Sequence, residues 1–150
     1  MDKIRQAIID HLKGKFPSME NSILAYTGML DEDSDEQISY QAPAILVCVL
    51  PIQEVPENIA PWELQAEIGL VVAMKAPGAL ERDKLGWDLT IKVAKECYRK
   101  TWGISPEFIR PSIITGIAKV ERRNRDNTPS GLDYWTITFY NWLKFEGIVS

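Results

Sequence analysis

The chain has 150 residues and a mass of 17.0 kDa, the size of one ordinary domain, so we expect a single domain over residues 1–150. Apolar residues make up 45%, charged residues 25%, and the mean hydropathy is −0.15, as in a soluble globular protein rather than a disordered or fibrous one. Lys and Arg number 17 against 21 Asp and Glu, a net charge of −4. This balance argues against a dedicated nucleic-acid binder, whose binding face is strongly basic.

The N-terminal residues lead directly into an amphipathic pattern, so we expect no signal peptide. The longest apolar run, Ala44–Leu50, is far shorter than the roughly 20 residues of a membrane-spanning helix, and no membrane association is expected. Cys48 and Cys97 both lie in apolar patterns, which favours buried free thiols over a disulfide and indicates a cytoplasmic protein.

Apolar residues at three- and four-residue steps predict an amphipathic helix over residues 2–15. Pro17 ends this helix, because the residue before a proline avoids the helical conformation. Residues 18–30 are compatible with a short strand or with a packed loop. Next comes a segment with five carboxylates in six residues, which predicts a solvated loop: Asp31, Glu32, Asp33, Asp35 and Glu36. Calcium is the alternative ligand, but the spacing lacks the glycine turn and distal glutamate of an EF-hand.

Two strands are predicted in the middle of the chain. Residues 42–51 form an apolar run between prolines, which fits a central strand covered on both faces. From Trp62 to Met74 apolar residues alternate with other residues, among them Glu63 and Glu67. This alternation predicts a long strand with one face in the core and, over its first half, the other face in water.

Helical spacing returns over residues 81–102, with a four-residue ridge that starts at Leu85, and Gly103 is expected just past the helix end. Residues 113–120 predict a further strand. In the last strand, alternation places Trp135, Ile137, Phe139, Leu143 and Phe145 toward the core, and Tyr134, Thr136, Thr138, Tyr140 and Trp142 on the other face.

The predicted order is therefore helix, strand, strand, helix, strand, strand. We expect an α+β fold in which a four-stranded, mainly antiparallel or mixed sheet carries two helices packed on one face.

Catalytic motifs are not found in the sequence. His11 is the only histidine, and both cysteines have apolar neighbours that keep a thiol unreactive. Glu63 and Glu67 are the best-placed pair of carboxylates, but a solvated strand face explains them more simply. No glycine-rich phosphate loop and no Cys or His pair at ligand spacing occurs. We therefore expect no enzymatic activity, no cofactor and no metal.

One basic cluster stands near a predicted turn between strands: Lys119, Arg122, Arg123 and Arg125. It is compatible with a hairpin kept soluble by charge, with phosphate binding, and with an acidic protein partner; we favour the first over nucleic acid.

The aromatic residues on the predicted solvent face of the last strand are a second candidate. Tyr134, Tyr140 and Trp142 are large side chains on a face that alternation assigns to water. Either a partner covers them, since interfaces are enriched in such residues, or a third layer of the same chain does.

The order of these features resembles a known family. The chain contains, in this order, a helix ending in Phe16-Pro17, an acidic loop, the run from Ala42 to Val47, a long strand, a helix, and a closing aromatic strand ending in Trp142–Gly147. This order over nearly the whole chain resembles small tail proteins of Mu-like phages and prophages, which are related to the phage tail terminators.

The resemblance implies a structural role without catalytic residues. A tail terminator forms a six-membered ring that caps the tail tube and docks the head connector, so the implied partners are copies of the chain, the tube protein and the connector. The implied location is the host cytoplasm during assembly and then the virion tail. The acidic loop 31–36 and the basic segment 119–125 become candidate contacts. A small ligand-binding or enzyme domain, and a generic protein-binding adaptor, remain the alternatives.

Overall fold

A computed structural model describes residues 2–26, 38, 41–50, 63–120 and 131–144. The carboxylate-rich segment 31–36, the proline-rich segment after residue 50 and most of the basic segment 119–125 lie outside the described residues, so the predictions made for them stay predictions.

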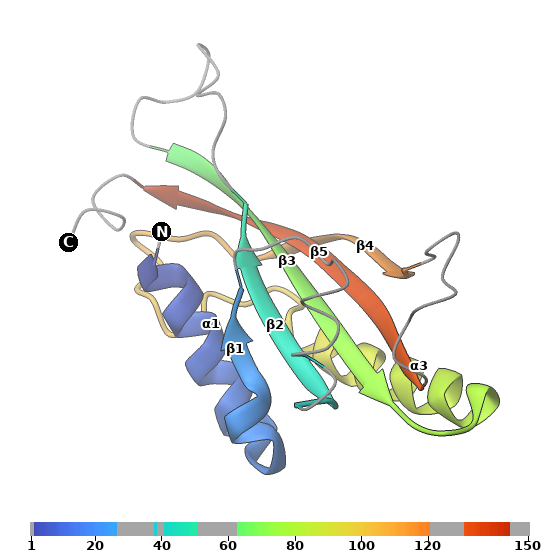
Figure 1. The fold of residues 1–150 in the computed structure, drawn as a ribbon. Coiled ribbons are helices and arrows are strands. Elements are labelled where there is room, and N and C mark those ends of the chain that lie inside the picture. The colour runs from blue at the N-terminus through green and yellow to red at the C-terminus, as the bar shows by residue number, and fades with distance from the viewer. Residues whose placement is uncertain (1, 27–37, 39–40, 51–62, 121–130, 145–150) are drawn as a thin grey trace.

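The described residues form helices and strands in the following order (Figure 1): α1 (Asp2–Lys15), a short 3-10 helix η1 (Pro17–Ser22), β1 (Ile23–Ala25), β2 (Ala44–Val49), β3 (Glu63–Lys75), α3 (Ala79–Glu96), β4 (Ile113–Lys119) and β5 (Leu132–Lys144). The predicted α+β class is confirmed, as are the bounds of the first helix and the places of the four predicted strands.

The strands form one sheet in the order β1-β2-β3-β5-β4. β1 runs parallel to β2, and the other neighbours are antiparallel, so the sheet is mixed. The prediction of four strands in the order helix, strand, strand, helix, strand, strand is wrong, because the ambiguous segment after Pro17 supplies a fifth strand, β1. Three strands, not two, therefore lie between α1 and α3 along the chain. With only three residues, β1 is too short to show an alternating pattern in the sequence.

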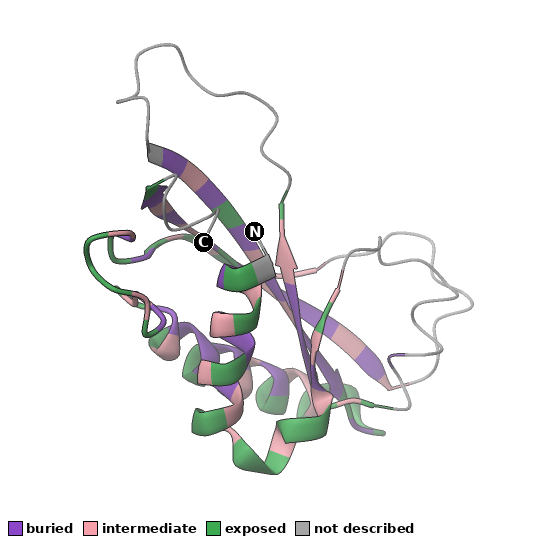
Figure 2. Ribbon diagram, turned by 90° about the vertical axis from the view of Figure 1, so that its left-hand side faces the viewer, coloured by how far each residue is buried: buried purple, intermediate pink, exposed green. Residues whose placement is uncertain are grey.

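Both helices pack on the same face of the sheet, which we call the helix face (Figure 1). Ile8 and Leu12 of α1 and Val93 of α3 join one buried cluster with alternate residues of β2, β3 and β5. Figure 2 shows exposed residues on the sides of the helices that point away from the sheet. The alternation predicted for the long strand is correct, since Leu64 and every second residue to Met74 are buried.

A glycine inside α3 makes room for the largest core side chain. Gly86 is buried, and a Cβ added to it would lie 1.9 Å from Cη2 of Trp135, which is fully buried on β5. Trp87 meets the same ring edge to face, at 6.3 Å between centroids. Glycine lowers helix propensity by about 1 kcal/mol relative to alanine, so its presence here reflects close packing of helix on sheet.

α3 ends at Glu96, earlier than the predicted residue 102. The hydroxyl of Ser112 donates to the carbonyl of Cys97 and accepts a 2.7 Å hydrogen bond from the amide of Lys100. The chain then leaves the helical conformation, with φ of +50° at Arg99 and +58° at Trp102. The helix is therefore ended by a buried hydroxyl from the segment before β4 and not by Gly103 alone.

Candidate interaction surface

The sheet face opposite the helices, which we call the outer face, is covered at one end. Tyr134 of β5 is only 2% exposed and packs with Leu46 of β2, Ala73 of β3 and Ile38, which belongs to the segment between β1 and β2. The expectation that Tyr134 is an exposed aromatic is therefore wrong. At this end Ile38 of the same chain packs over the sheet, so Tyr134 needs no partner to bury it.

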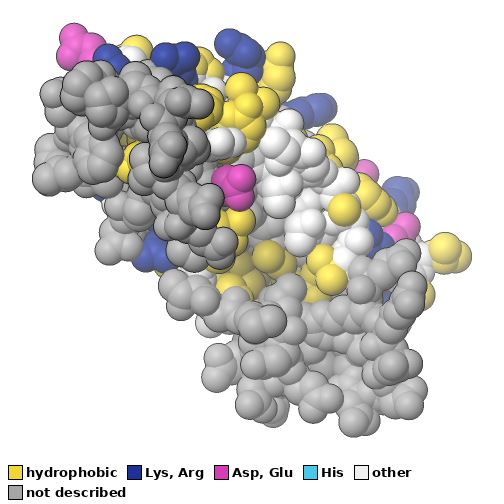
Figure 3. Space-filling model, turned by 90° about the horizontal axis from the view of Figure 1, so that it is seen from above, with side chains coloured by type: hydrophobic (Ala, Val, Ile, Leu, Met, Phe, Trp, Pro, Cys, Tyr) yellow, Lys and Arg dark blue, Asp and Glu magenta, His cyan; other side chains and the backbone are white. Residues whose placement is uncertain are grey.

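Further along β5 the outer face is open. Tyr140 and Trp142 are half-buried and meet edge to face, with 6.4 Å between ring centroids. In the sheet register they lie beside Glu67 and Gln65 of β3 respectively. Figure 3 shows mainly uncharged side chains in the middle of the outer face. Two predicted interface aromatics thus occupy a largely uncharged surface that the described chain leaves partly uncovered.

Threonines continue this surface toward β4. Thr138 of β5 and Thr115 of β4 are exposed, and their hydroxyls lie 3.1 Å apart. The hydroxyl of Thr115 also contacts the carbonyl oxygen of Thr138 at 3.2 Å. These bonds hold the side chains flat against the sheet. We use the name open outer face for Gln65, Glu67, Thr115, Thr138, Tyr140 and Trp142.

β4 lies at the end of the sheet and presents apolar side chains on both sides. Ile113 shares the outer face with Tyr140 and is 43% exposed. Ile117 shares the helix face with Ile137 and is 37% exposed, because α3 packs over β3 and β5. Among the described strands only β5 pairs with β4, so no described strand bonds to the backbone groups on its other side.

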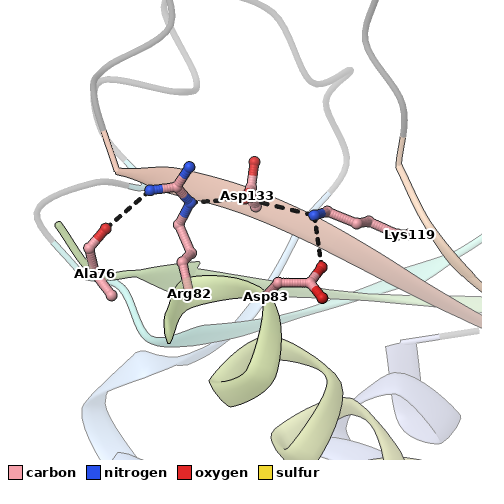
Figure 4. A network of polar contacts seen from close by, with 5 residues as sticks. All are labelled: Ala76, Arg82, Asp83, Lys119 and Asp133. Atoms are coloured by element: carbon pink, nitrogen blue, oxygen red, sulfur yellow. Dashed lines mark hydrogen bonds and ion pairs between the residues drawn. The ribbon is translucent and has the colours of Figure 1, made fainter. Parts of the chain in front are cut away.

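Lys119, the one described member of the predicted basic cluster, lies in a network within the chain (Figure 4). Its Nζ is 2.8 Å from Oδ1 of Asp83 on α3 and 3.7 Å from Oδ2 of Asp133 on β5. The same Asp133 oxygen accepts a 2.6 Å bond from Nε of Arg82, whose Nη1 donates to the carbonyl of Ala76. Lys119 therefore links β4 to α3 and β5.

The side chains that the sequence offers as catalytic candidates do not lie near one another. Nε2 of His11 lies 3.1 Å from Oε2 of Glu96, and its ring meets Trp102 edge to face at 5.4 Å, so His11 joins α1 to α3 on the helix face. Glu67 is exposed on the outer face, on the other side of the sheet. Among the described residues, no group of three or more His, Cys, Asp and Glu side chains is placed to hold a metal ion.

Both cysteines are free, as predicted, but only Cys97 is buried; Cys48 is half-buried. Burial, with a smaller effect of the neighbouring carboxylate of Glu96, raises the pKa of the Cys97 thiol to about 12. The thiol therefore stays protonated and unreactive at neutral pH.

Two buried polar residues that the sequence patterns did not single out fix the loop after α3. The side-chain oxygen of Asn141 accepts a bond from Nε1 of Trp102, and its Nδ2 donates to the carbonyls of Lys100 and Arg110. Ser112 holds the start of the same loop. In the sequence, Asn141 can be recognised as a structural residue only because it is polar at a position where the alternation of β5 predicts a buried side chain.

No protein-family model matches the sequence, and the search of curated proteins found no match. Among solved structures, the chain is similar to a chain in the virion of a native gene transfer agent particle, with 10% identity, a TM-score of 0.48 and coverage of 93% of each chain. Likeness at this level leaves the function to be argued from the residues themselves. In the described part of the chain, no helix is both long and apolar enough to span a membrane.

Proposed function

We propose that the chain is a structural subunit of a phage-type tail: a tail terminator that forms a six-membered ring of identical copies, caps the tail tube and docks the head connector. The observation that carries the proposal is the open outer face with its pair of aromatics, continued at the β4 edge by the exposed side chain of Ile113. A largely uncharged surface with half-buried aromatic side chains is typical of contact sites, because aromatic residues are enriched in interfaces.

The placement of the reactive groups supports assembly rather than catalysis. His11 is held by Glu96 and Trp102 on the helix side, Glu67 faces away from both, and the thiol of Cys97 is buried. A catalytic site would need an acid, a base or a nucleophile converging on one space. Within the described residues these groups serve separate structural contacts.

The arrangement of elements also supports the proposal. The resemblance to tail terminators rests on a helix that ends before Pro17, a buried strand, a long strand, a helix and an aromatic strand. These elements correspond to α1, β2, β3, α3 and β5. They include the strands that carry the open outer face.

Self-assembly of the purified chain tests the proposal. We expect monomers or loose oligomers in dilute solution and rings at high concentration or on tail tubes, because the contacts of an exposed surface are individually weak. Light scattering and negative-stain electron microscopy across a concentration series measure this. A tight two-fold dimer that persists on dilution, with no rings on tubes, would overturn the terminator function.

The genes beside the coding sequence give an independent test. Neighbouring genes for tail tube, sheath and connector proteins would support the proposal. Neighbouring genes for a metabolic pathway, together with monomers at every concentration, would contradict it and favour the ligand-binding or enzyme alternative.

A further inference from the structure

The sheet has two unlike edges whose strands run in opposite directions. β1 and β2 are parallel, β3 is antiparallel to β2, β5 to β3, and β4 to β5. Following these pairings across the sheet makes β4 antiparallel to β1, although the two strands lie at opposite edges.

The β4 edge has one common protection of an exposed edge strand, a register shift between Ile114 and Gly116, but no unbound lysine within the strand. Lysine side chains and inward-pointing charges commonly keep such edges from pairing with other chains. Here the single lysine, Lys119, is bound to Asp83, while Ile113 and Ile117 are exposed on the two sides of the strand. A strand added to this edge would find backbone hydrogen-bonding groups and apolar neighbours on both faces.

The β1 edge is short but also available. β1 pairs with β2 alone among the described strands, and the amide of Tyr26 extends the pairing by donating to the carbonyl of Val47. Ile23 is buried under α1, whereas Ala25 is exposed. The other side of β1 therefore offers a short row of backbone groups beside a small side chain.

We propose that β4 of one copy pairs antiparallel with β1 of the next copy, so that the sheets of the ring join into one continuous sheet. This inference rests on the proposed ring function and names the contact that builds it. A rotation about an axis that runs along the strands preserves strand direction, so neighbouring copies bring β4 and β1 together as an antiparallel pair, the more stable kind of pairing.

The unlike edges also specify how the assembly grows. A β4–β1 contact uses a different surface on each of the two copies, which is the property that lets a ring close with more than two members. Pairing β4 with β4 would instead stop at two copies. Joining through β4 and β1 keeps all helices on one side of the sheet and places the open outer face of every copy on the other.

Lysine substitutions test the β4 edge directly. Ile113→Lys and Ile117→Lys place a charge beside the proposed strand pair, and we expect each to weaken self-association about tenfold or more. Leu85→Lys on α3 is the matched control, since Leu85 is 40% exposed and helical spacing places it on the side of α3 opposite Asp83, which binds Lys119 of β4. Sedimentation velocity across a concentration series measures the association, and circular dichroism verifies the fold of each variant.

Site-directed cross-linking then tests which edges meet. Ala25→Cys and Ile117→Cys both lie on the helix face, and Cys48→Ala in each protein removes the half-buried thiol. With a short bis-maleimide, we expect cross-linked pairs only when the two cysteine variants are mixed. A chain that carries both cysteines should give a ladder of higher oligomers.

The outcomes separate the inference from the function on which it rests. Cross-linking of Ile117→Cys protein with itself would show a two-fold β4 contact and overturn the inference. Wild-type rings that persist unchanged in the lysine variants would also overturn it but leave the terminator function standing. Absence of association by the wild-type chain, in solution and on tubes, would overturn both.

Discussion

The two faces of the sheet differ in what their aromatic residues contact. On the helix face, Trp135 and Phe139 are fully buried, and even a helix glycine is needed to fit the indole ring. On the outer face, Tyr134 is buried by the chain itself, whereas Tyr140 and Trp142 further along the same strand remain half-exposed. β5 thus supplies core residues on one face, while its other face is buried at Tyr134 and partly exposed at Tyr140 and Trp142.

This difference shows that alternation in a strand identifies its two faces but not what covers them. α1 and α3 cover the centre of the helix face, while on the outer face Ile38 packs with Tyr134 at one end and, among the described residues, Tyr140 and Trp142 stay partly exposed at the other. Substitutions on the helix face should therefore change stability, and those on the open outer face should change association.

The largest effect is expected at Asn141, the polar residue of the helix face. Asn141→Leu keeps the approximate volume but leaves Nε1 of Trp102 and the carbonyls of Lys100 and Arg110 without their partner, which should lower the free energy of unfolding by about 3 kcal/mol. Thr138→Val on the outer face of the same strand is the control and should change it by less than about 1 kcal/mol. Urea denaturation measures both; equal effects would contradict the comparison.

A smaller loss is expected where α3 meets the sheet. Gly86→Ala should lower the free energy of unfolding by about 2 kcal/mol, because the new methyl group would collide with Trp135. Gly14→Ala on α1, where nothing lies within 4 Å, should instead raise it by up to about 1 kcal/mol through helix propensity. Thermal unfolding of the two variants gives the sign of each change in stability. Stabilisation by Gly86→Ala would refute the close packing of Gly86 against Trp135.

On the open outer face, Trp142→Ala should act on association. Because this face lies outside the β4–β1 contact, we expect binding to tail tubes to weaken by about 2 kcal/mol, with a change in unfolding free energy below about 1 kcal/mol. Co-sedimentation with tail tubes and differential scanning calorimetry measure the two quantities. A lowered melting temperature with unchanged tube binding would make Trp142 a packing residue.

The raised pKa of the Cys97 thiol predicts a loss of stability at alkaline pH. Its pKa is about 12 in the folded chain against 9.0 for an ordinary thiol, so above pH 9 the unfolded chain loses a proton that the folded chain keeps. The contribution of this thiol to the free energy of unfolding is complete below pH 9 and falls by on the order of 1 kcal/mol by pH 10. Denaturant titrations at pH 8 and pH 10 should show a smaller drop for Cys97→Ala than for the wild type.

The smallest effect is expected at His11. His11→Gln can still donate a hydrogen bond to Glu96, so the unfolding free energy should change by no more than about 0.5 kcal/mol, and ring assembly should be unaffected. Failure of a folded His11→Gln protein to assemble would assign this residue a functional role that the proposed function does not give it.

The long elements were predictable from the sequence because their periodicity extends over many residues. α1 ends at the predicted residue, and the alternation of β3 and β5 correctly assigned the buried residues from Leu64 to Met74 and from Trp135 to Leu143; Trp62 and Phe145 lie outside the described residues. Elements fixed by contacts distant in sequence were not predictable. β1 has three residues, and the end of α3 depends on Ser112, which no local pattern relates to Cys97.

The candidate site was predicted only in part for the same reason. Tyr140 and Trp142 lie on the predicted face and remain partly exposed, but the burial of Tyr134 depends on Ile38, nearly a hundred residues earlier in the chain. Lys119 counted as part of a basic cluster in the sequence, yet in the fold it is bound by carboxylates of α3 and β5.

The position of β5 has a consequence for the order in which the protein folds during synthesis. β5 is the last described strand along the chain but lies inside the sheet, between β3 and β4, and supplies Trp135 and Asn141 to the core. While the ribosome makes the earlier segments, β3 has no neighbour on that side and α3 has no indole to pack against. The apolar strands of the nascent chain must therefore stay soluble until β5 has emerged. Folding should be slow, because the pairing of β3 with β5 joins segments that are distant in the sequence.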